Sequence, residues 1–140
     1  MTLPNKISDF EGQWHLKRVI QDAKAGQIVH ADGQASLKRS DDGLIYEEEV
    51  TLCVPGQVPM KGTRRYQWRE AEGAIAIYFE DGRYFHTLKL GLPRVLDHHD
   101  CPPDSYDAVY GFSGWPCWNV RWTVSGPRKS YEMNTEYSPR

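Results

Sequence analysis

The sequence has little cysteine and no long apolar run, and both shortages exclude classes of protein. Its three cysteines, Cys53, Cys101 and Cys117, are odd in number and form no C-x-x-C pair, which is typical of reduced thiols rather than a disulfide framework. No run reaches the roughly 18 apolar residues of a membrane-spanning helix, so no membrane partner is expected. Residues 1–10 lack a basic start followed by an apolar stretch. We therefore expect no secretory signal and a cytoplasmic location.

An excess of one charge is also missing. The chain carries 17 Lys and Arg residues against 19 Asp and Glu, which gives a formal net charge of −2. A nucleic-acid-binding domain normally shows a basic excess or stripe, so no nucleic-acid partner is expected. The sequence has neither a phosphate-binding Gly-x-x-x-x-Gly-Lys loop nor a Gly-x-Ser-x-Gly nucleophile elbow. We expect no cofactor, and these absences leave the question of an enzyme open.

Aromatic residues, in contrast, are plentiful. Five Trp, eight Tyr and four Phe make up 12% of the 140 residues, although the mean hydropathy is only −0.67. A disordered chain of that hydropathy would be poor in aromatics, so this chain is expected to fold around its rings. Its length predicts a single domain over residues 1–140.

Alternation of apolar and polar residues predicts strands rather than helices. Residues 118–125 alternate strictly, which is typical of a strand with one buried face. Gly126 and Pro127 follow as a turn, and the next residues alternate again. If these two form the loop, Ser125 faces Arg128 and the hairpin places Trp122 opposite Tyr131.

A second hairpin is predicted at Asp81-Gly82, a favoured two-residue type I′ turn. The register places Ile77 opposite His86 on an inward face. The other face of this hairpin pairs Tyr78 with Phe85 at the surface.

The remaining segments resemble these hairpins, and together they indicate about ten strands without helical inserts. Short strands at regular spacing predict a sandwich or barrel. An up-and-down antiparallel barrel of about 8–10 strands leaves no exposed edge and can hold one small ligand. The other predicted strands are residues 14–21, 28–39, 44–53, 61–70, 95–100 and 105–112.

The run Phe10-Glu11-Gly12-Gln13-Trp14 resembles the Gly-x-Trp entry of lipocalin-type calycins. This resemblance implies that Trp14 begins the first strand and packs at the closed end of a barrel, with Gly12 before it. It also implies a basic residue that caps the indole, and Arg128 is the matching position; a cation over an indole has a physical rationale.

Two further segments, residues 97–106 and 126–131, resemble an uncharacterised family of small bacterial lipocalin-like proteins. That resemblance implies a barrel and no known activity. The chain departs from secreted lipocalins at residues 90–94, where their Thr-Asp-Tyr-like turn is missing. Residues 22–27 are too few for the helical lid of fatty-acid-binding proteins.

Polar residues on otherwise apolar strand faces are the candidate binding groups. Arg18 and Arg64 share faces with aromatic residues, and a buried guanidinium needs a carboxylate, a cap or an anionic ligand. Either arginine can instead lie at a barrel mouth and reach water. His86 is either a core histidine bonded to a carbonyl or a Tyr hydroxyl, or a polar anchor for a ligand. The candidate ligand-binding residues are His86, Arg64, Arg18, Tyr106, Tyr110, Trp68, Trp118 and Trp122.

Metal-ligand residue types gather in Asp97-His98-His99-Asp100-Cys101. Neighbours on a strand point to opposite faces, so a usable set would be His99 and Cys101 joined by His86. The spacing matches no standard zinc signature, and turn chemistry before Pro102-Pro103 explains the segment as well.

Three functions remain open. The leading hypothesis is binding of a small, partly apolar and anionic molecule inside the barrel. The second is a barrel enzyme that uses His86 or His99 as an acid–base group. The third is a filled barrel that binds a protein partner through exposed aromatics such as Tyr78 and Phe85. The oligomeric state is not predicted.

Overall fold

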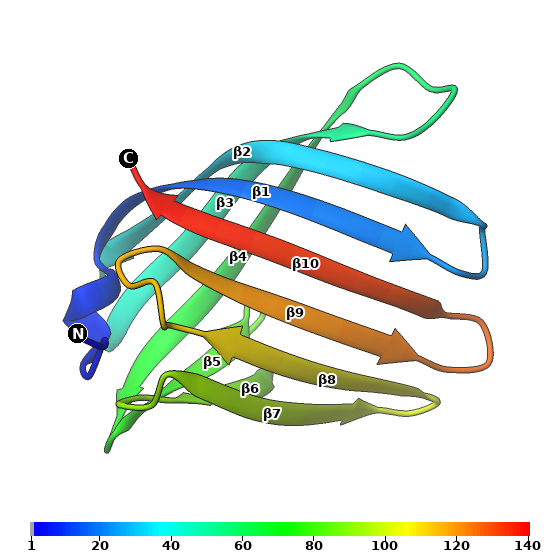
Figure 1. The fold of residues 1–140 in the computed structure, drawn as a ribbon. Helices are drawn as coiled ribbons and strands as arrows, with labels where there is room; N and C mark the ends of the chain where they lie inside the picture. The colour runs from blue at the N-terminus through cyan, green and yellow to red at the C-terminus, as the bar shows by residue number, and fades with distance from the viewer. Residues whose placement is uncertain (1) are drawn as a thin grey trace.

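Ten antiparallel strands and one short 3₁₀ helix make up the chain, in a computed structural model that describes residues 2–140 (Figure 1). The predicted all-β fold is therefore confirmed. The elements are η1 (Ile7–Phe10), β1 (Gly12–Asp22), β2 (Gln27–Arg39), β3 (Gly43–Cys53), β4 (Met60–Ala71), β5 (Ala74–Phe79), β6 (Tyr84–Lys89), β7 (Arg94–Cys101), β8 (Asp104–Gly111), β9 (Trp118–Ser125) and β10 (Ser130–Pro139).

The strands form one sheet that curls into a nearly closed up-and-down barrel, as predicted. Their order is β6-β5-β4-β3-β2-β1-β10-β9-β8-β7, so each strand pairs with a sequence neighbour except where β1 meets β10. The sheet's two end strands, β6 and β7, face each other across a seam. There the Thr87 backbone N–H donates to the Asp97 carboxylate at 2.7 Å. A side chain thus links the two end strands.

The buried face of each strand follows the alternation of its sequence. In β9, Trp118, Val120, Trp122 and Val124 are buried and the residues between them are exposed. This pattern places aromatic rings inside the barrel and polar residues outside. The low mean hydropathy is therefore compatible with an aromatic core.

The helix η1 closes one end of the barrel, where β1 begins. Phe10 is fully buried there, and its ring contacts those of Trp68, Trp118 and Trp115 edge-on at centroid distances of 5.0–5.5 Å. The Trp14 indole N–H donates to the Phe10 carbonyl at 3.0 Å. The loops β1–β2, β3–β4, β5–β6, β7–β8 and β9–β10 lie at the opposite end, called here the far end.

Arg128 does not cap Trp14, so the role implied by the resemblance is wrong. Arg128 lies in the exposed loop between β9 and β10, whereas Trp14 pairs with Pro139 at the other end of β10. The length of β10 separates them by about 30 Å at the usual rise per residue. The Trp14 indole instead packs against Trp115 and Trp118, at 5.8 and 5.9 Å.

The predicted β9–β10 hairpin exists, but its register differs by two residues. The turn spans four residues, closed by the Gly126 N–H donating to the Lys129 carbonyl, and Trp122 lies opposite Met133 rather than Tyr131. A shift of two residues leaves every side chain on its original face. The inward set was therefore correct although the pairing was wrong.

The β5–β6 hairpin departs from prediction in a way that matters for the interior. Its loop has three residues, with Gly82 at φ 90° in the third position, and a bulge follows between Ile77 and Tyr78. The bulge restores the predicted Ile77–His86 pairing but turns Phe85 inward. Tyr78 pairs with Tyr84 instead.

No helix among residues 2–140 is long and apolar enough to cross a membrane. The three cysteines are free and exposed.

Candidate functional site

A buried ion pair lies at the centre of the barrel. The Arg18 guanidinium, 5% exposed, donates to both oxygens of Glu48 at 2.6 and 2.8 Å, and its Nε donates to Thr135 Oγ1 at 2.8 Å. The two partners lie two strands apart, on β1 and β3. Between them, the middle of β2 turns the small residues Ala31 and Ala35 inward, which leaves room for the long side chain to cross. Arg18 is therefore neutralised by the protein itself.

Two phenols extend this network toward β10. The Tyr46 hydroxyl donates to Glu48 Oε1 at 2.6 Å and lies 2.7 Å from the Tyr137 hydroxyl. Because an ionised Glu48 can only accept, Tyr46 must donate to it, and Tyr137 must then donate to Tyr46. Since Tyr137 donates its only hydroxyl hydrogen to Tyr46, its oxygen can only accept further hydrogen bonds.

The pKa values agree with an ionised pair. Burial by itself raises the pKa of Glu48, but the hydrogen bonds and charge of Arg18 outweigh it and hold that pKa below its usual value. Burial likewise lowers the pKa of Arg18, and the hydrogen bond and charge of Glu48 reverse the sign. Burial raises the pKa of Tyr137 to about 12. The interior thus holds a permanent charge pair at neutral pH.

Glu48 was not predicted as the partner of Arg18, although the sequence contains a signal for it. Leu44, Tyr46 and Val50 mark the inward face of β3, and Glu48 falls on that face. A carboxylate at an inward position, in a chain with an inward arginine, indicates a buried pair. Its neighbours Glu47 and Glu49 are exposed and obscured the pattern.

His86 is the second buried polar group, at 2% exposure. Its Nε2 lies 2.8 Å from the Tyr110 hydroxyl, while its Nδ1 is buried without a partner among residues 2–140. Burial lowers the pKa of His86 to about 4, so the ring is neutral at neutral pH. The Tyr110 hydroxyl has no other acceptor in the described chain, so its hydrogen is satisfied by donation to Nε2. Nδ1 then carries the ring proton and is an unused donor.

A small cavity of about 50 Å³ lies among these groups. Trp118 lines the same cavity, and its indole nitrogen is also buried without a hydrogen-bond partner in the part of the chain that the structure describes. Buried polar atoms normally form hydrogen bonds with protein or water. Two unused N–H donors on residues that line one cavity therefore indicate that a molecule in the cavity accepts hydrogen bonds from them. The other lining residues are Arg18, Tyr46, Glu48, Arg64, Tyr66, Trp68, Ile77, Phe85, Tyr110, Val120, Trp122, Met133, Thr135 and Tyr137.

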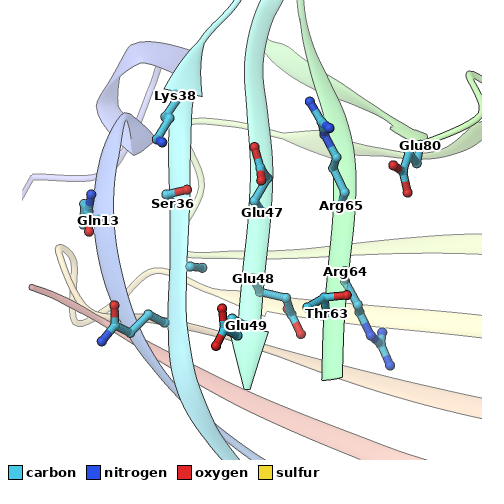
Figure 2. A pocket seen from close by; sticks show the side chains of 12 residues that line it. Gln13, Ser36, Lys38, Glu47, Glu48, Glu49, Thr63, Arg64, Arg65 and Glu80 are labelled. Carbon is cyan, nitrogen blue, oxygen red and sulfur yellow. The ribbon is translucent and has the colours of Figure 1, made fainter. Parts of the chain in front are cut away.

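Arg64 lies on the far-end side of this cavity. It pairs directly with Glu48 across the β3–β4 ladder, and Figure 2 shows the two side chains on these neighbouring strands. Arg64 is exposed and has no carboxylate within 4 Å in the described residues, whereas Glu48 is already held by Arg18. Two guanidinium groups and one carboxylate therefore leave a surplus positive charge on the cavity wall.

A second hollow, of about 440 Å³, lies on the outer side of β2, β3 and β4 (Figure 2). Most of its lining residues are exposed and polar or charged, among them Lys38, Glu47, Glu49 and Arg65. Glu49 pairs with Lys61 at 2.8 Å. This surface is solvated and carries no buried polar group without a partner among the described residues.

Seven of the eight predicted binding residues line the interior cavity. The exception is Tyr106, whose hydroxyl accepts from Lys129 at 3.3 Å and whose ring lies 6.3 Å from Trp122. Alternation predicted which side chains point inward. It could not indicate which of them already satisfy one another.

The metal candidates do not converge. Among residues 2–140 no group of three His, Cys, Asp or Glu side chains is arranged to hold a metal ion, and Cys101 is exposed. His86 and His99 both pack edge-on against Phe85, at 4.5 and 5.2 Å. The predicted outward aromatic patch is wrong for Phe85, whose ring stacks inside on Phe79 and Trp122.

The low pKa of His86 predicts an acid-sensitive fold. Between pH 6.5 and about 4 the unfolded chain binds a proton on this histidine that the folded protein does not, so stability falls as the pH falls. We expect a loss of about 2 kcal/mol from this group between pH about 7 and about 4.5. Denaturant unfolding at both pH values should show this loss shrinking in His86→Gln. The exposed His15→Gln serves as the control, and equal pH dependence in both variants would contradict the assignment.

Comparison with known proteins gives a family and a fold. The chain's fold is similar to that of the S-type phycobiliprotein lyase CPES from Guillardia theta, with a TM-score of 0.58 and 8% sequence identity. The match covers 96% of this chain and 90% of that one, and at this sequence identity it shows a similar fold and nothing further. No curated protein matches the sequence. Residues 10–139 match the model of a family of unknown function, DUF6314, and the chain belongs to that family.

Proposed function

We propose that the barrel binds a small, partly apolar and anionic molecule in its interior cavity. The observation that supports this is the pair of unpartnered buried nitrogens, His86 Nδ1 and Trp118 Nε1, which belong to two residues that line one cavity. Leaving a buried donor unpaired costs about 1–3 kcal/mol, so an occupant that accepts from both would stabilise the fold.

The cavity volume limits the size of this occupant. Drug-sized ligands occupy pockets of about 300–1,000 Å³, whereas this cavity measures about 50 Å³. One water needs on the order of 10–15 Å³ by the same measure. The interior therefore suits a few waters or a ligand of a few non-hydrogen atoms.

The polarity of the wall favours an acceptor-rich, negatively charged ligand. His86 and Trp118 offer N–H groups, and Arg64 supplies a cation without a carboxylate partner within 4 Å in residues 2–140. Trp68, Trp122 and Val120 supply apolar wall for a short hydrocarbon portion. A short-chain carboxylate meets both requirements.

Titration with acetate, propionate and isobutyrate tests this proposal, with the corresponding neutral amides as matched probes. We expect saturable shifts of the Trp118 indole N–H resonance, identified by its absence in Trp118→Phe. Ligands this small reach at best about −1.5 kcal/mol per non-hydrogen atom, so acetate should bind with a Kd no lower than about 40 μM. The carboxylates should bind more tightly than the amides.

Filling the cavity provides the control. Val120→Ile adds one methylene to the cavity wall and should weaken binding by about tenfold or more, since little space is free. Val109→Ile makes the same change at a residue outside the cavity lining and should leave binding unchanged. A Trp118 resonance that no probe moves, or that moves equally in both valine variants, would overturn the proposal.

A further inference from the structure

Part of strand β4 has a free edge. Residues 60–65 pair with β3, but β5 joins β4 only from Tyr66 onward, where Phe79 is its partner. Figure 1 shows the β3–β4 hairpin projecting beyond the rest of the sheet. In an antiparallel pair every second residue directs its N–H and C=O away from the partner strand. Those groups face solvent along about 20 Å of β4.

A groove runs beside this edge. It has a volume of about 510 Å³ and is lined by Arg64, Arg65, Tyr66, Phe79, Glu80 and Asp81. The strand that would fill it is missing because β5 ends at Phe79 and the chain turns back into β6. The groove therefore lies where a further strand would continue the sheet.

The edge segment itself carries three cations. Lys61, Arg64 and Arg65 fall within six residues, and Lys61 alone of the three has a carboxylate within 4 Å in the described chain, namely Glu49. Arg64 and Arg65 are neighbours on a strand and point to opposite faces of it, as Figure 2 shows. Asp81 in the groove is paired with Arg83. Two carboxylates without an ion-pair partner in the described residues lie nearby, Glu80 in the groove and Glu47 opposite Arg65 on β3.

We propose that residues 60–65 of β4 bind an extended acidic segment of another protein by strand addition. The partner's backbone forms hydrogen bonds with the unpaired N–H and C=O groups of β4. Two consecutive Asp or Glu residues in the partner point to opposite faces, so one meets Arg64 and the other meets Arg65. This surface shares Arg64 with the interior cavity, whereas Arg65 does not line that cavity.

A second copy of this chain fits the edge poorly. Two β4 edges paired antiparallel would bring Lys61, Arg64 and Arg65 of one copy against the same cations of the other. Like charges directly opposite on paired strands are destabilising. The three cations of residues 60–65 therefore favour an acidic partner strand over a second copy of this chain.

Binding of a fluorescein-labelled decapeptide tests the proposal, with Val and Thr flanking a central Asp-Glu pair. We expect saturable anisotropy and slower amide exchange confined to residues 60–65. The double variant Arg64→Gln/Arg65→Gln should bind about tenfold more weakly, as expected for two exposed ion pairs. Arg121→Gln removes a positive charge from β9 instead, and this variant should bind the peptide as the wild type does. The cavity variant Val120→Ile should also bind the peptide as the wild type does.

Two N-methylated peptides distinguish backbone pairing from simple charge attraction. In one peptide the backbone N–H groups of the odd-numbered residues are methylated, and in the other those of the even-numbered residues. One of the two should lose binding, since a strand pairs through one of its edges only. Equal binding of both methylated peptides, equal binding of an Asn-Gln peptide, or formation of a dimer of the chain without peptide would each overturn the proposal.

Discussion

Glu48→Gln is expected to lower the free energy of unfolding by about 3–5 kcal/mol, because it leaves the buried charge of Arg18 without a counter-charge. The amide keeps the size of the carboxylate, so the loss reports charge rather than packing. Glu48 also accepts from Tyr46, and Tyr46 in turn from Tyr137, so a neutral side chain weakens the whole network. Urea unfolding at neutral pH, followed by circular dichroism, measures the difference.

Glu49→Gln is the matched control, one residue along the same strand. Its carboxylate forms an exposed pair with Lys61, so its loss should leave the free energy of unfolding almost unchanged. Replacing both members of the buried pair, in Arg18→Met/Glu48→Leu, should recover most of the lost stability. If Glu48→Gln and Glu49→Gln are equally mild, the ion pair does not have the buried character assigned to it.

Phe10→Ala is the second large effect expected, with a loss of about 3–5 kcal/mol in unfolding free energy. Phe10 is fully buried and contacts the rings of Trp68, Phe112, Trp115 and Trp118. These large rings come from different elements, so they cannot collapse easily into the space left behind. Thermal unfolding followed by near-ultraviolet circular dichroism reports both stability and the order of the aromatic cluster.

Leu96→Ala is the control for truncation alone. Leu96 is 64% exposed on β7, and its loss should cost no more than about 0.5 kcal/mol. A Phe10→Ala variant that unfolds at the wild-type midpoint would show that η1 is not required to close the barrel.

The architecture could be predicted because the alternation of apolar and polar residues identifies the inward face of a strand even when its pairing register is wrong by two residues. The β9–β10 register was wrong by two residues, yet Trp122 and Tyr131 stayed on the inward face, since faces repeat every second residue. Phe85 escaped prediction because a bulge moves a residue from one face to the other, and bulges leave little local signal. Strand number and inward faces are thus accessible from sequence, whereas loop length and bulges are not.

The candidate site was predictable to the same depth. Inward polar residues such as His86 and Arg18 are visible as exceptions in an apolar face. Whether each is satisfied depends on strands distant in sequence. Glu48 satisfies Arg18 from β3, while the Trp118 indole nitrogen remains without a protein partner in the described chain. Only the assembled barrel separates these cases.

The pairing of β1 with β10 has a consequence for how the chain folds. Every other ladder joins consecutive strands, but this one brings Trp14 to Pro139 across almost the whole chain. Its closure carries the largest loop entropy in the molecule and is expected to come late in folding. Moving the chain ends to the β6–β7 connection and joining the present termini would make every ladder local. The seam between β6 and β7 is thus a natural place for new chain ends in a circularly permuted barrel.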